Sequence, residues 1–210
     1  MKVLVLAPHP DDETIGCGGT LLAHAKRGDQ VVAVFLTSGE LGLKHLPREK
    51  AWAIREAEAR KAGKIIGLAN LFFLRGPDWM LGDNIESAAG TLQPVLGAEH
   101  PELIYAPHEN EWHPDHKAAV PILRRAVQNA SLPAPEIRTY EVWTPLAEFV
   151  HVEDITPVIN QKMKALRAYA SQLKEFDYAH AVRGLNAFRG VTAAKKRYAE
   201  VFQSLPLEKP

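Results

Sequence analysis

The sequence contains a single cysteine and no long apolar stretch. Cys17 stands alone among 210 residues, which excludes an intramolecular disulfide framework and a zinc site built from several thiolates. A reducing, cytoplasmic compartment is therefore expected. No run approaches the roughly 18 consecutive apolar residues of a membrane-spanning helix, and the apolar start ends at Pro8, too early for a signal peptide. We therefore expect a soluble protein without a membrane partner.

An excess of either charge is also missing, since 25 Lys and Arg residues balance 25 Asp and Glu residues. Such a chain has no overall field to attract nucleic acid, so we expect no nucleic acid among its partners. With 46% hydrophobic and 24% charged residues, the composition is typical of a globular protein. A small molecule is the expected partner. The oligomeric state stays open, and a homo-oligomer is compatible with this composition.

Short apolar runs alternate with helix-like segments along most of the chain. The runs predict strands at residues 3–7, 31–36, 71–74, 103–106 and 138–143, whereas the segments between them predict helices at residues 14–27, 48–66, 85–96 and 115–129. This alternation predicts an α/β fold with a doubly wound, mainly parallel sheet and helices on both faces. The length favours a single domain of residues 1–210, with a core in residues 1–145 and a C-terminal elaboration in residues 146–210.

The C-terminal elaboration has weaker signals. A short strand is predicted at residues 151–153, and helices are predicted at residues 156–173 and 193–203. Thr156 and Pro157 are typical of a helix start, because threonine caps the first turn and proline is tolerated in it. The segment between the two helices is not assigned to an element. We expect the helices to pack against the sheet or to wall its ligand crevice.

Two clusters of polar residues follow two of the predicted strands. Residues 9–13, His-Pro-Asp-Asp-Glu, come directly after the strand at 3–7, and residues 113–116, His-Pro-Asp-His, follow the strand at 103–106. If these are neighbouring parallel strands, both clusters leave the sheet at its carboxyl edge, where open α/β folds bind ligands. We therefore interpret the clusters as two parts of one site.

Histidine and aspartate in this pattern are typical of a zinc site. Zinc is commonly held by imidazole nitrogen and carboxylate oxygen, and catalytic sites leave one position open beside three protein ligands. His9, Asp12 and His116 supply such a set, while Asp11 stays free to face the open position. Zn²⁺ is therefore the expected cofactor, and another divalent transition metal would fit the same ligands.

The second cluster contains two histidines with different expected roles. Pro114 suits the first turn of a helix, which puts His113 just before that helix and His116 one turn inside it. We assign His116 to the metal and His113 to the reacting group, with Asp115 available to orient an imidazole. The predicted catalytic residues are thus Asp11, His113 and Asp115.

Each cluster also has a simpler interpretation. The acidic residues at 11–13 would be favoured at a helix N-terminus by about 0.3–1 kcal/mol. A His-x-x-His pair by itself is most often a pair of surface or capping residues. The metal site is favoured because two such clusters follow separate strands of one expected sheet.

The motifs resemble those of the LmbE-like, or PIG-L, family of zinc-dependent N-deacetylases. The resemblance rests on residues 7–13, on the Gly-x-Gly-Gly-Thr segment at 16–20 and on residues 113–116, and more loosely on the Tyr-x-Ser-Gln segment at 169–172. It implies a Rossmann-like fold and a hydrolase that removes the acetyl group from N-acetylglucosamine-type amino sugars or their conjugates.

The resemblance also implies roles for single residues that agree with the interpretation of the two clusters. Three residues would bind zinc: His9, Asp12 and His116. Asp11 would act as the base, and His113 would stabilise or protonate the reacting amide. Arg55 and Asp78 resemble positions that contact sugar hydroxyls in the family, although a helix-surface ion pair and a turn are the simpler roles for these two.

One segment departs from the family pattern. Some members carry a tyrosine just before the second cluster that helps to hold the oxyanion, whereas this chain has Glu-Asn-Glu-Trp at residues 109–112. Oxyanion stabilisation would then come from zinc and His113, or from another group. We interpret Glu109 and Glu111 as solvated loop charges.

Other functions are compatible with parts of the sequence. Glycines at 16–19 after a strand occur in nucleotide-binding loops, but the acidic residues before them and the incomplete spacing argue against phosphate, and close helix packing explains them more simply. A non-catalytic zinc- or sugar-binding protein would share the ligands without turnover. A metal-dependent hydrolase of another ester or amide would use the same activated water. Three residues are candidates for a sugar-stacking platform, although packing is the simpler role for each: Trp79, Trp112 and Trp143.

Overall fold

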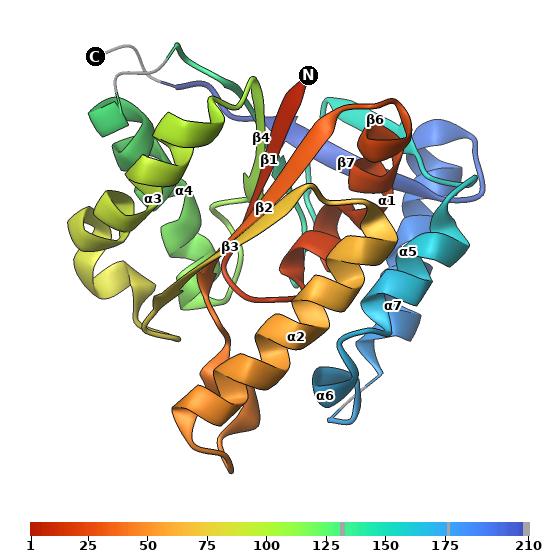
Figure 1. Cartoon of the computed structure of the whole chain (residues 1–210). Coiled ribbons are helices and arrows are strands. Elements are labelled where there is room, and N and C mark those ends of the chain that lie inside the picture. The colour runs from red at the N-terminus through yellow and green to blue at the C-terminus, as the bar shows by residue number, and fades with distance from the viewer. Residues whose placement is uncertain (131–132, 176, 208–210) are drawn as a thin grey trace.

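The centre of the fold is a seven-stranded sheet whose strands lie in the order β3-β2-β1-β4-β5-β7-β6 (Figure 1). The computed structural model describes residues 1–130, 133–175 and 177–207. Its strands are β1 (Lys2–Ala7), β2 (Gln30–Thr37), β3 (Asn70–Gly76), β4 (Leu103–Pro107), β5 (Glu136–Tyr140), β6 (His151–Asp154) and β7 (Ala199–Ser204). Strands β1 to β5 pair in parallel, and β7 pairs antiparallel with β5 and β6. The predicted mainly parallel α/β sheet is confirmed.

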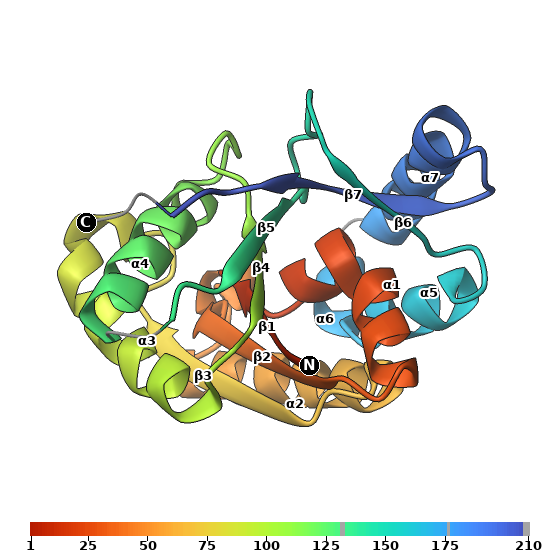
Figure 2. The same ribbon diagram turned by 90° about the horizontal axis from the view of Figure 1, so that it is seen from above.

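Helices cover both faces of the sheet, as predicted. They are α1 (Asp12–Lys26), α2 (Arg48–Ile66), α3 (Ile85–Glu99), α4 (Pro114–Ala130), α5 (Ile159–Leu166), α6 (Ala170–Leu173) and α7 (Tyr178–Arg189), with short turns η1 (Glu40–Leu43), η2 (Leu81–Asn84) and η3 (Gly190–Ala194). In Figure 2, α3 and α4 lie on one side of the sheet, and α1, α2 and α5 lie on the other. Val3 and Val5 of β1 join the core on the α1 side, whereas Leu4 and Leu6 join the core on the α4 side. Burial on both faces explains why this strand is a continuous apolar run.

Helix α1 packs close to the sheet and is kinked at Cys17, where φ is −139°. A Cβ atom on Gly16 would lie 2.1 Å from Cδ2 of Tyr140, and one on Gly19 would lie 2.5 Å from Cγ2 of Ile155. Neither position has room for a side chain. The glycines therefore allow close helix packing, as the sequence predicted.

A fully buried ion pair, Lys162–Glu200, connects α5 to β7. Nζ of Lys162 donates to Oε1 of Glu200 at 2.7 Å and to the side-chain oxygen of Asn186 at 2.8 Å. The Glu200 carboxylate also accepts the backbone N–H groups of Gly19 and Thr20, at 2.8 and 2.7 Å, and thereby caps α1 beyond its kink. Both charges thus have the additional hydrogen bonds that a buried ion pair needs.

Glu200→Ala is expected to lower the free energy of unfolding by about 3–5 kcal/mol, because it leaves the ammonium group of Lys162 buried without its counter-charge. Urea unfolding followed by circular dichroism measures this loss. The double change of Lys162→Met with Glu200→Leu should cost less than Glu200→Ala alone, since no charge is then buried unpaired. A double variant less stable than the single one would contradict this explanation.

The structure corrects the C-terminal predictions. The predicted helix at residues 193–203 is wrong, because residues 199–204 form strand β7 between β5 and β6. Pairing on both sides of this strand overrides the helix propensity of the Ala- and Lys-rich residues before it. The predicted helix at 156–173 is divided into α5 and α6 and begins at Ile159 rather than near Thr156. Strand β6 matches the predicted short strand, and α7 occupies the segment to which no element was assigned.

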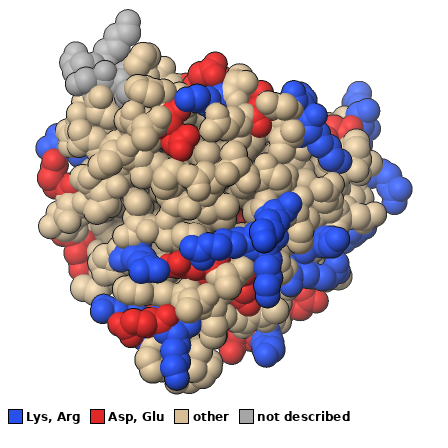
Figure 3. All heavy atoms as spheres, viewed as in Figure 1, with Lys and Arg blue, Asp and Glu red and all other residues tan. Residues whose placement is uncertain are grey.

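Charges of both signs are mixed on the face drawn in Figure 3. Lys and Arg side chains gather over the lower and right-hand parts of this face, and Asp and Glu side chains lie among them. This mixture agrees with the equal counts of the two kinds of residue. Within residues 1–130, 133–175 and 177–207, no helix combines the length and apolar character that crossing a bilayer requires.

Candidate metal centre

The two polar clusters meet at the carboxyl edge of the sheet. Strands β1 and β4 are parallel neighbours, with β2 beyond β1 on one side and β5 beyond β4 on the other. The strand order therefore reverses between them, and open α/β sheets form their ligand crevice at such a point. Residues 8–11 lead from β1 into α1, and residues 108–113 lead from β4 into α4. The prediction that the clusters follow neighbouring parallel strands is confirmed.

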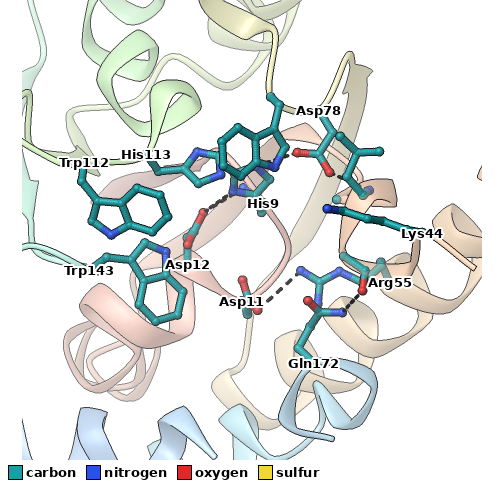
Figure 4. Close-up of a pocket in the computed structure, with 14 residues that line it drawn as sticks. His9, Asp11, Asp12, Lys44, Arg55, Asp78, Trp112, His113, Trp143 and Gln172 are labelled. Carbon is teal, nitrogen blue, oxygen red and sulfur yellow. Dashed lines mark hydrogen bonds and ion pairs between the residues drawn. The ribbon is translucent and has the colours of Figure 1, made fainter. Parts of the chain in front are cut away.

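A cavity of about 360 Å³, named here the reaction chamber, opens at this edge (Figure 4). Six of the predicted site residues line it: His9, Asp11, Asp12, Arg55, Asp78 and His113. The other two, Asp115 and His116, are fully buried and contact lining residues from behind. The three tryptophans considered as a stacking platform also line the chamber.

One oxygen of Asp12 lies close to a ring nitrogen of His9 and to a ring nitrogen of His116. Oδ2 of Asp12 lies 3.2 Å from Nδ1 of His9 and 3.2 Å from Nε2 of His116. Two ligand atoms of a tetrahedral zinc site with bonds near 2.1 Å are about 3.4 Å apart, so these spacings suit a single ion. His113 also contributes to the cluster, since ring nitrogens of His9, His113 and His116 lie within 4.8 Å of one another.

His116 provides the strongest sign that the cluster fits a metal ion. Both of its ring nitrogens are buried and have no hydrogen-bond partner in the described part of the chain. Leaving a buried polar atom unpaired costs about 1–3 kcal/mol. Nε2 nevertheless faces Asp12, and Nδ1 lies 3.9 Å from Oε2 of Glu111. A divalent cation shared with Asp12 would give Nε2 its partner, so the donor set fits a metal ion.

The second ring nitrogen of His9 faces two carboxylates. Nε2 lies 3.1 Å from Oδ2 of Asp115 and 3.1 Å from Oδ1 of Asp78. A histidine that binds metal through one nitrogen normally donates its other N–H to such a carboxylate. Burial lowers the pKa of His9, but hydrogen bonds to the surrounding carboxylates outweigh burial and raise it well above its usual range. The surroundings of His9 therefore favour positive charge, as a cation site requires.

Asp115 holds both His9 and the loop beside it. Its Oδ2 accepts the backbone N–H of Trp79 at 2.7 Å, and its Oδ1 accepts that of Leu81 at 3.1 Å. The side chain is fully buried behind His9. The imidazole that this carboxylate contacts is thus His9, and Asp115 is placed to position that ring from outside the chamber lining.

Asp115→Asn is expected to weaken metal affinity by about 10- to 100-fold, because the amide no longer fixes the tautomer and orientation of His9. Competition with a chelator of known affinity measures the change. Asp78→Asn is the matched comparison, since Asp78 contacts the same nitrogen but also lines the chamber and should affect substrate binding as well. Unchanged metal affinity in Asp115→Asn would exclude the positioning role.

Asp11 is held in a strained backbone conformation. Its φ of 128° lies outside the regions that non-glycine residues normally adopt, at a cost of order 1–3 kcal/mol. Glu13 supports this conformation, because its Oε2 accepts the backbone N–H of Asp11 at 3.1 Å. Oδ2 of Asp11 accepts the hydroxyl of Tyr178 at 2.8 Å and lies 3.4 Å from Nη2 of Arg55. Burial raises the pKa of Asp11 to about 6, and the positive charge of Arg55 limits the rise.

His113 presents a neutral imidazole to the chamber. Its Nδ1 accepts the backbone N–H of Asp115 at 3.2 Å, which leaves the ring proton on Nε2. Burial lowers the pKa of His113 to about 4, and the charges of His9 and His116 act in the same direction. The ring packs against Trp79, with centroids 4.5 Å apart. His113 can therefore donate a hydrogen bond while it carries no charge.

A comparison with known proteins assigns this architecture to a family. Residues 4–127, more than half of the chain, match the PIG-L family, GlcNAc-PI de-N-acetylase. The chain belongs to the PIG-L family. It is 30% identical over 186 residues to the probable N-acetyl-alpha-D-glucosaminyl L-malate deacetylase 2 of Bacillus anthracis, in a match that covers 81% of this chain and 80% of the relative.

Solved structures share the fold over nearly the whole chain. The conserved protein TT1542 from Thermus thermophilus superposes with a TM-score of 0.86 at 32% identity, covering 99% of this chain and 96% of that one. The N,N'-diacetylchitobiose deacetylase from Pyrococcus horikoshii superposes with a TM-score of 0.86 at 26% identity, covering 98% and 84%. The fold shared with these two structures therefore includes the C-terminal strands and helices, for which the sequence predictions were partly wrong.

The structure corrects the interpretation of Glu111 as a solvated loop charge. Glu111 is fully buried, and its Oε1 accepts the backbone N–H groups of residues 142–144 at 2.7, 3.0 and 3.2 Å. Strand β5 ends at Tyr140, whereas the sequence predicted a strand up to residue 143. This PIG-L member thus uses Glu111 to anchor the segment after β5 as a wall of the chamber. Glu109 is exposed, as expected.

Two tyrosines from the C-terminal part of the chain contact the acidic cluster. Tyr178, which was not predicted as a site residue, donates to Asp11 from 167 residues away. Tyr169 donates at 2.6 Å to Glu13, 156 residues away, and belongs to the Tyr-x-Ser-Gln segment on which part of the family resemblance rests. Gln172 of the same Tyr-x-Ser-Gln segment lines the chamber. Separations of this size leave no local pattern by which the tyrosines could be found.

The surroundings of Arg55 and Asp78 do not match the helix-surface ion pair and the turn that were their simpler roles. Arg55 is only 2% exposed, and its Nε and Nη1 have no hydrogen-bond partner among the described residues. Gly39, with φ of 64°, lies against the guanidinium group, since a Cβ atom there would be 3.1 Å from Nε. Asp78 uses one oxygen for His9 and the other for the backbone N–H of Leu41, at 2.8 Å. Arg55 thus has two unpaired nitrogens buried beneath the chamber lining, while both carboxylate oxygens of Asp78 already have partners.

Proposed function

We propose that the chain is a zinc-dependent N-deacetylase, a hydrolase that removes the N-acetyl group from an N-acetylglucosamine-type amino sugar or its conjugate. The observation that carries this proposal is the placement of Asp11, a buried carboxylate that lines the same chamber as His9 and Asp12. The chamber volume of about 360 Å³ lies in the range of small-molecule sites. The names of the malate-conjugate and diacetylchitobiose deacetylases among its relatives support the substrate class.

The ligand set supports zinc in a catalytic role. His9, Asp12 and His116 would hold the ion, and imidazole and carboxylate are ligands that zinc accepts. Three protein ligands are typical of catalytic zinc sites, whereas closed structural sites usually have four. The bound ion would supply a Lewis acid that polarises the amide carbonyl and lowers the pKa of water toward neutrality.

Asp11 is the general base of the proposed reaction. With a pKa of about 6 it is ionised near neutral pH and still basic enough to take a proton. The oxygen of water forms the new bond to the carbonyl carbon, and the water proton passes to Asp11. Tyr178 and Arg55 orient the carboxylate during this transfer. When the C–N bond breaks, Asp11 returns the proton to the amine nitrogen, so that acetate and a free amino sugar leave.

His113 stabilises the negative charge that develops on the carbonyl oxygen. Its Nε2–H is a donor in a largely buried site, where such hydrogen bonds stabilise an oxyanion most effectively. Because burial lowers the pKa of His113 to about 4, the ring donates a hydrogen bond rather than a proton. This role replaces the tyrosine that some family members carry before the second cluster. The proton for the amine is therefore assigned to Asp11.

Arg55 and Trp79 bind the sugar in this proposal. Arg55 lines the chamber, and a shift of its guanidinium group on binding would bring the buried N–H groups that lack a partner among the described residues to sugar hydroxyl oxygens. Trp79 lines the chamber and is 48% exposed, so its indole offers an apolar face to a sugar ring. The substrate partner is thus a small amino-sugar molecule. A nucleotide has less support, because Gly16 and Gly19 of α1 are explained by their close contacts with Tyr140 and Ile155.

Acetate release by zinc-loaded protein tests the proposed function. The protein is incubated with N-acetylglucosamine, its malate and inositol conjugates and diacetylchitobiose, and zinc content is measured in the same preparation. We expect one zinc ion per chain and equal amounts of acetate and free amine from at least one substrate. Zinc-loaded protein that releases neither product would contradict the proposal, and turnover of an ester alone would redirect it to another hydrolase.

A further inference from the structure

A second cavity lies directly behind one wall of the reaction chamber. Its volume is about 210 Å³, and Trp143 belongs to the lining of both cavities. Tyr178 lines the second cavity, while its hydroxyl donates to Asp11 in the reaction chamber. The rings of Trp143 and Tyr178 meet edge to face, with centroids 5.7 Å apart and planes at 90°. These two rings therefore form the partition between the cavities.

The second cavity offers a mainly apolar surface. Most of its lining comes from Ile15, Val142, Pro145, Ala181, Val182 and Leu185. The two charged or amide side chains in the lining, Glu141 and Asn186, already have partners. Glu141 accepts from Arg189 at 2.7 Å, and Asn186 accepts from Lys162 at 2.8 Å. An alkyl chain suits such a lining, because it needs no hydrogen-bond partner when it leaves water.

A hydrogen bond from its backbone N–H holds Trp143 in place. Buried Glu111 accepts the N–H of Trp143 at 3.0 Å, together with the N–H groups of the residues before and after it. The indole of Trp143 packs on Tyr178, which the Asp11 carboxylate holds in turn. The partition is therefore part of the rigid wall of the chamber.

The place left for the acyl group of a bound amide follows from the positions proposed for the two other groups on its carbonyl carbon. The carbonyl carbon carries an oxygen directed at His113, a nitrogen that bears the sugar, and the acyl carbon. In Figure 4, Arg55 and Gln172 lie on one side of the chamber, and Trp112 and Trp143 lie on the opposite side. A sugar bound at Arg55 leaves the opposite side of the chamber, where Trp143 lies, to the acyl group.

We propose that Trp143 determines the length of the acyl group that the enzyme removes, restricting it to acetyl. The indole closes the acyl side of the reaction chamber and blocks access to the second cavity. Removing it would join the two cavities, and the added space would accept an alkyl chain. This inference rests on the proposed amide hydrolysis and deepens it by naming the residue that selects the acyl group.

The relative rates on N-hexanoyl- and N-acetylglucosamine test this role. The measured quantity is the ratio of kcat/KM for the two substrates in one preparation, so that a loss of active protein cancels. Trp143→Ala and Trp143→Leu should each raise the hexanoyl-to-acetyl ratio by at least about tenfold, since each buried methylene contributes about fourfold. Leu41→Ala is the matched control and should leave the ratio unchanged, because Leu41 lines the reaction chamber but not the second cavity.

A refilling substitution distinguishes a joined cavity from a loosened site. Ala181 is exposed at the second cavity, so Ala181→Trp fills that space from the surface. Combined with Trp143→Ala, it should return the hexanoyl-to-acetyl ratio toward the wild-type value. A ratio that stays high in the double variant would show that the second cavity does not hold the chain, which overturns the proposal.

Binding of hexanoate and acetate to the zinc-loaded protein gives a readout without turnover. Calorimetry should show that Trp143→Ala binds hexanoate at least about tenfold more tightly than the wild type does, with little change for acetate. Unchanged hexanoate binding and an unchanged substrate ratio in Trp143→Ala would overturn the acyl-length role. Wild-type protein that releases no acetate from any substrate would instead overturn the proposed function, and the binding data would still test the partition.

Discussion

Asp11→Asn is expected to lower kcat for acetate release by about 100- to 10,000-fold while the protein still binds one zinc ion per chain. The amide has nearly the size of the carboxylate but cannot accept the proton of the attacking water. Metal content should persist because Asp11 stands beside the three proposed ligands and is not one of them. Steady-state kinetics and zinc analysis on the same preparation measure both quantities.

Asparagine is the informative replacement because of the backbone at this position. Asp11 has a φ of 128°, and asparagine tolerates positive φ better than alanine does. A loss of turnover can then be assigned to the missing base instead of a collapsed loop. Asp83→Asn, at an exposed aspartate of η2, is the matched control and should keep wild-type kcat. Turnover retained in Asp11→Asn would remove Asp11 as the base.

His116→Ala is expected to weaken zinc affinity by more than about 100-fold. Loss of a residue that only orients a metal ligand weakens affinity by about 10- to 100-fold, and loss of the ligand itself should weaken it more. The ring is fully buried and its Nε2 faces Oδ2 of Asp12 at 3.2 Å, so the substitution removes one of the three proposed ligand atoms. Acetate release at limiting zinc should fall with the affinity. Competition with a chelator gives the affinity directly.

His180→Ala serves as the control for this substitution. His180 is an exposed histidine of α7, so its removal tests whether any surface imidazole contributes to zinc binding. Its zinc affinity should equal that of the wild type. Equal losses in His116→Ala and His180→Ala would indicate non-specific zinc binding, and unchanged affinity in His116→Ala would exclude His116 as a ligand.

The first two thirds of the fold could be predicted because its signals are local. Strand β1 is buried on both faces, so Val3 to Ala7 form a continuous apolar run, and α2 ends at Gly67, whose φ of 92° suits glycine. Alternation of strands and helices then restricts the topology to a parallel, doubly wound sheet. No such restriction applies after β5, where β7 becomes a strand only through its partners on either side.

Some residues of the candidate site could likewise be predicted from local sequence, and others could not. His9, Asp12 and His116 could be proposed from two short motifs at the ends of strands, where the fold itself brings them together. Glu111 could not, because a glutamate in a polar loop has the same local pattern whether it is solvated or accepts three backbone N–H groups. Tyr178 could not either, since its contact with Asp11 depends on how α7 packs. Residues that hold the reactive groups in place therefore required the structure.

Anomalous X-ray diffraction at the zinc edge from crystals of the zinc-loaded protein locates the proposed ion. We predict one peak per chain, within about 2.0–2.2 Å of Nδ1 of His9, Oδ2 of Asp12 and Nε2 of His116, with the Asp11 carboxylate beside the ion but not bound to it. A peak on the opposite side of His9, between the carboxylates of Asp78 and Asp115, would show that the three residues are not the zinc ligands.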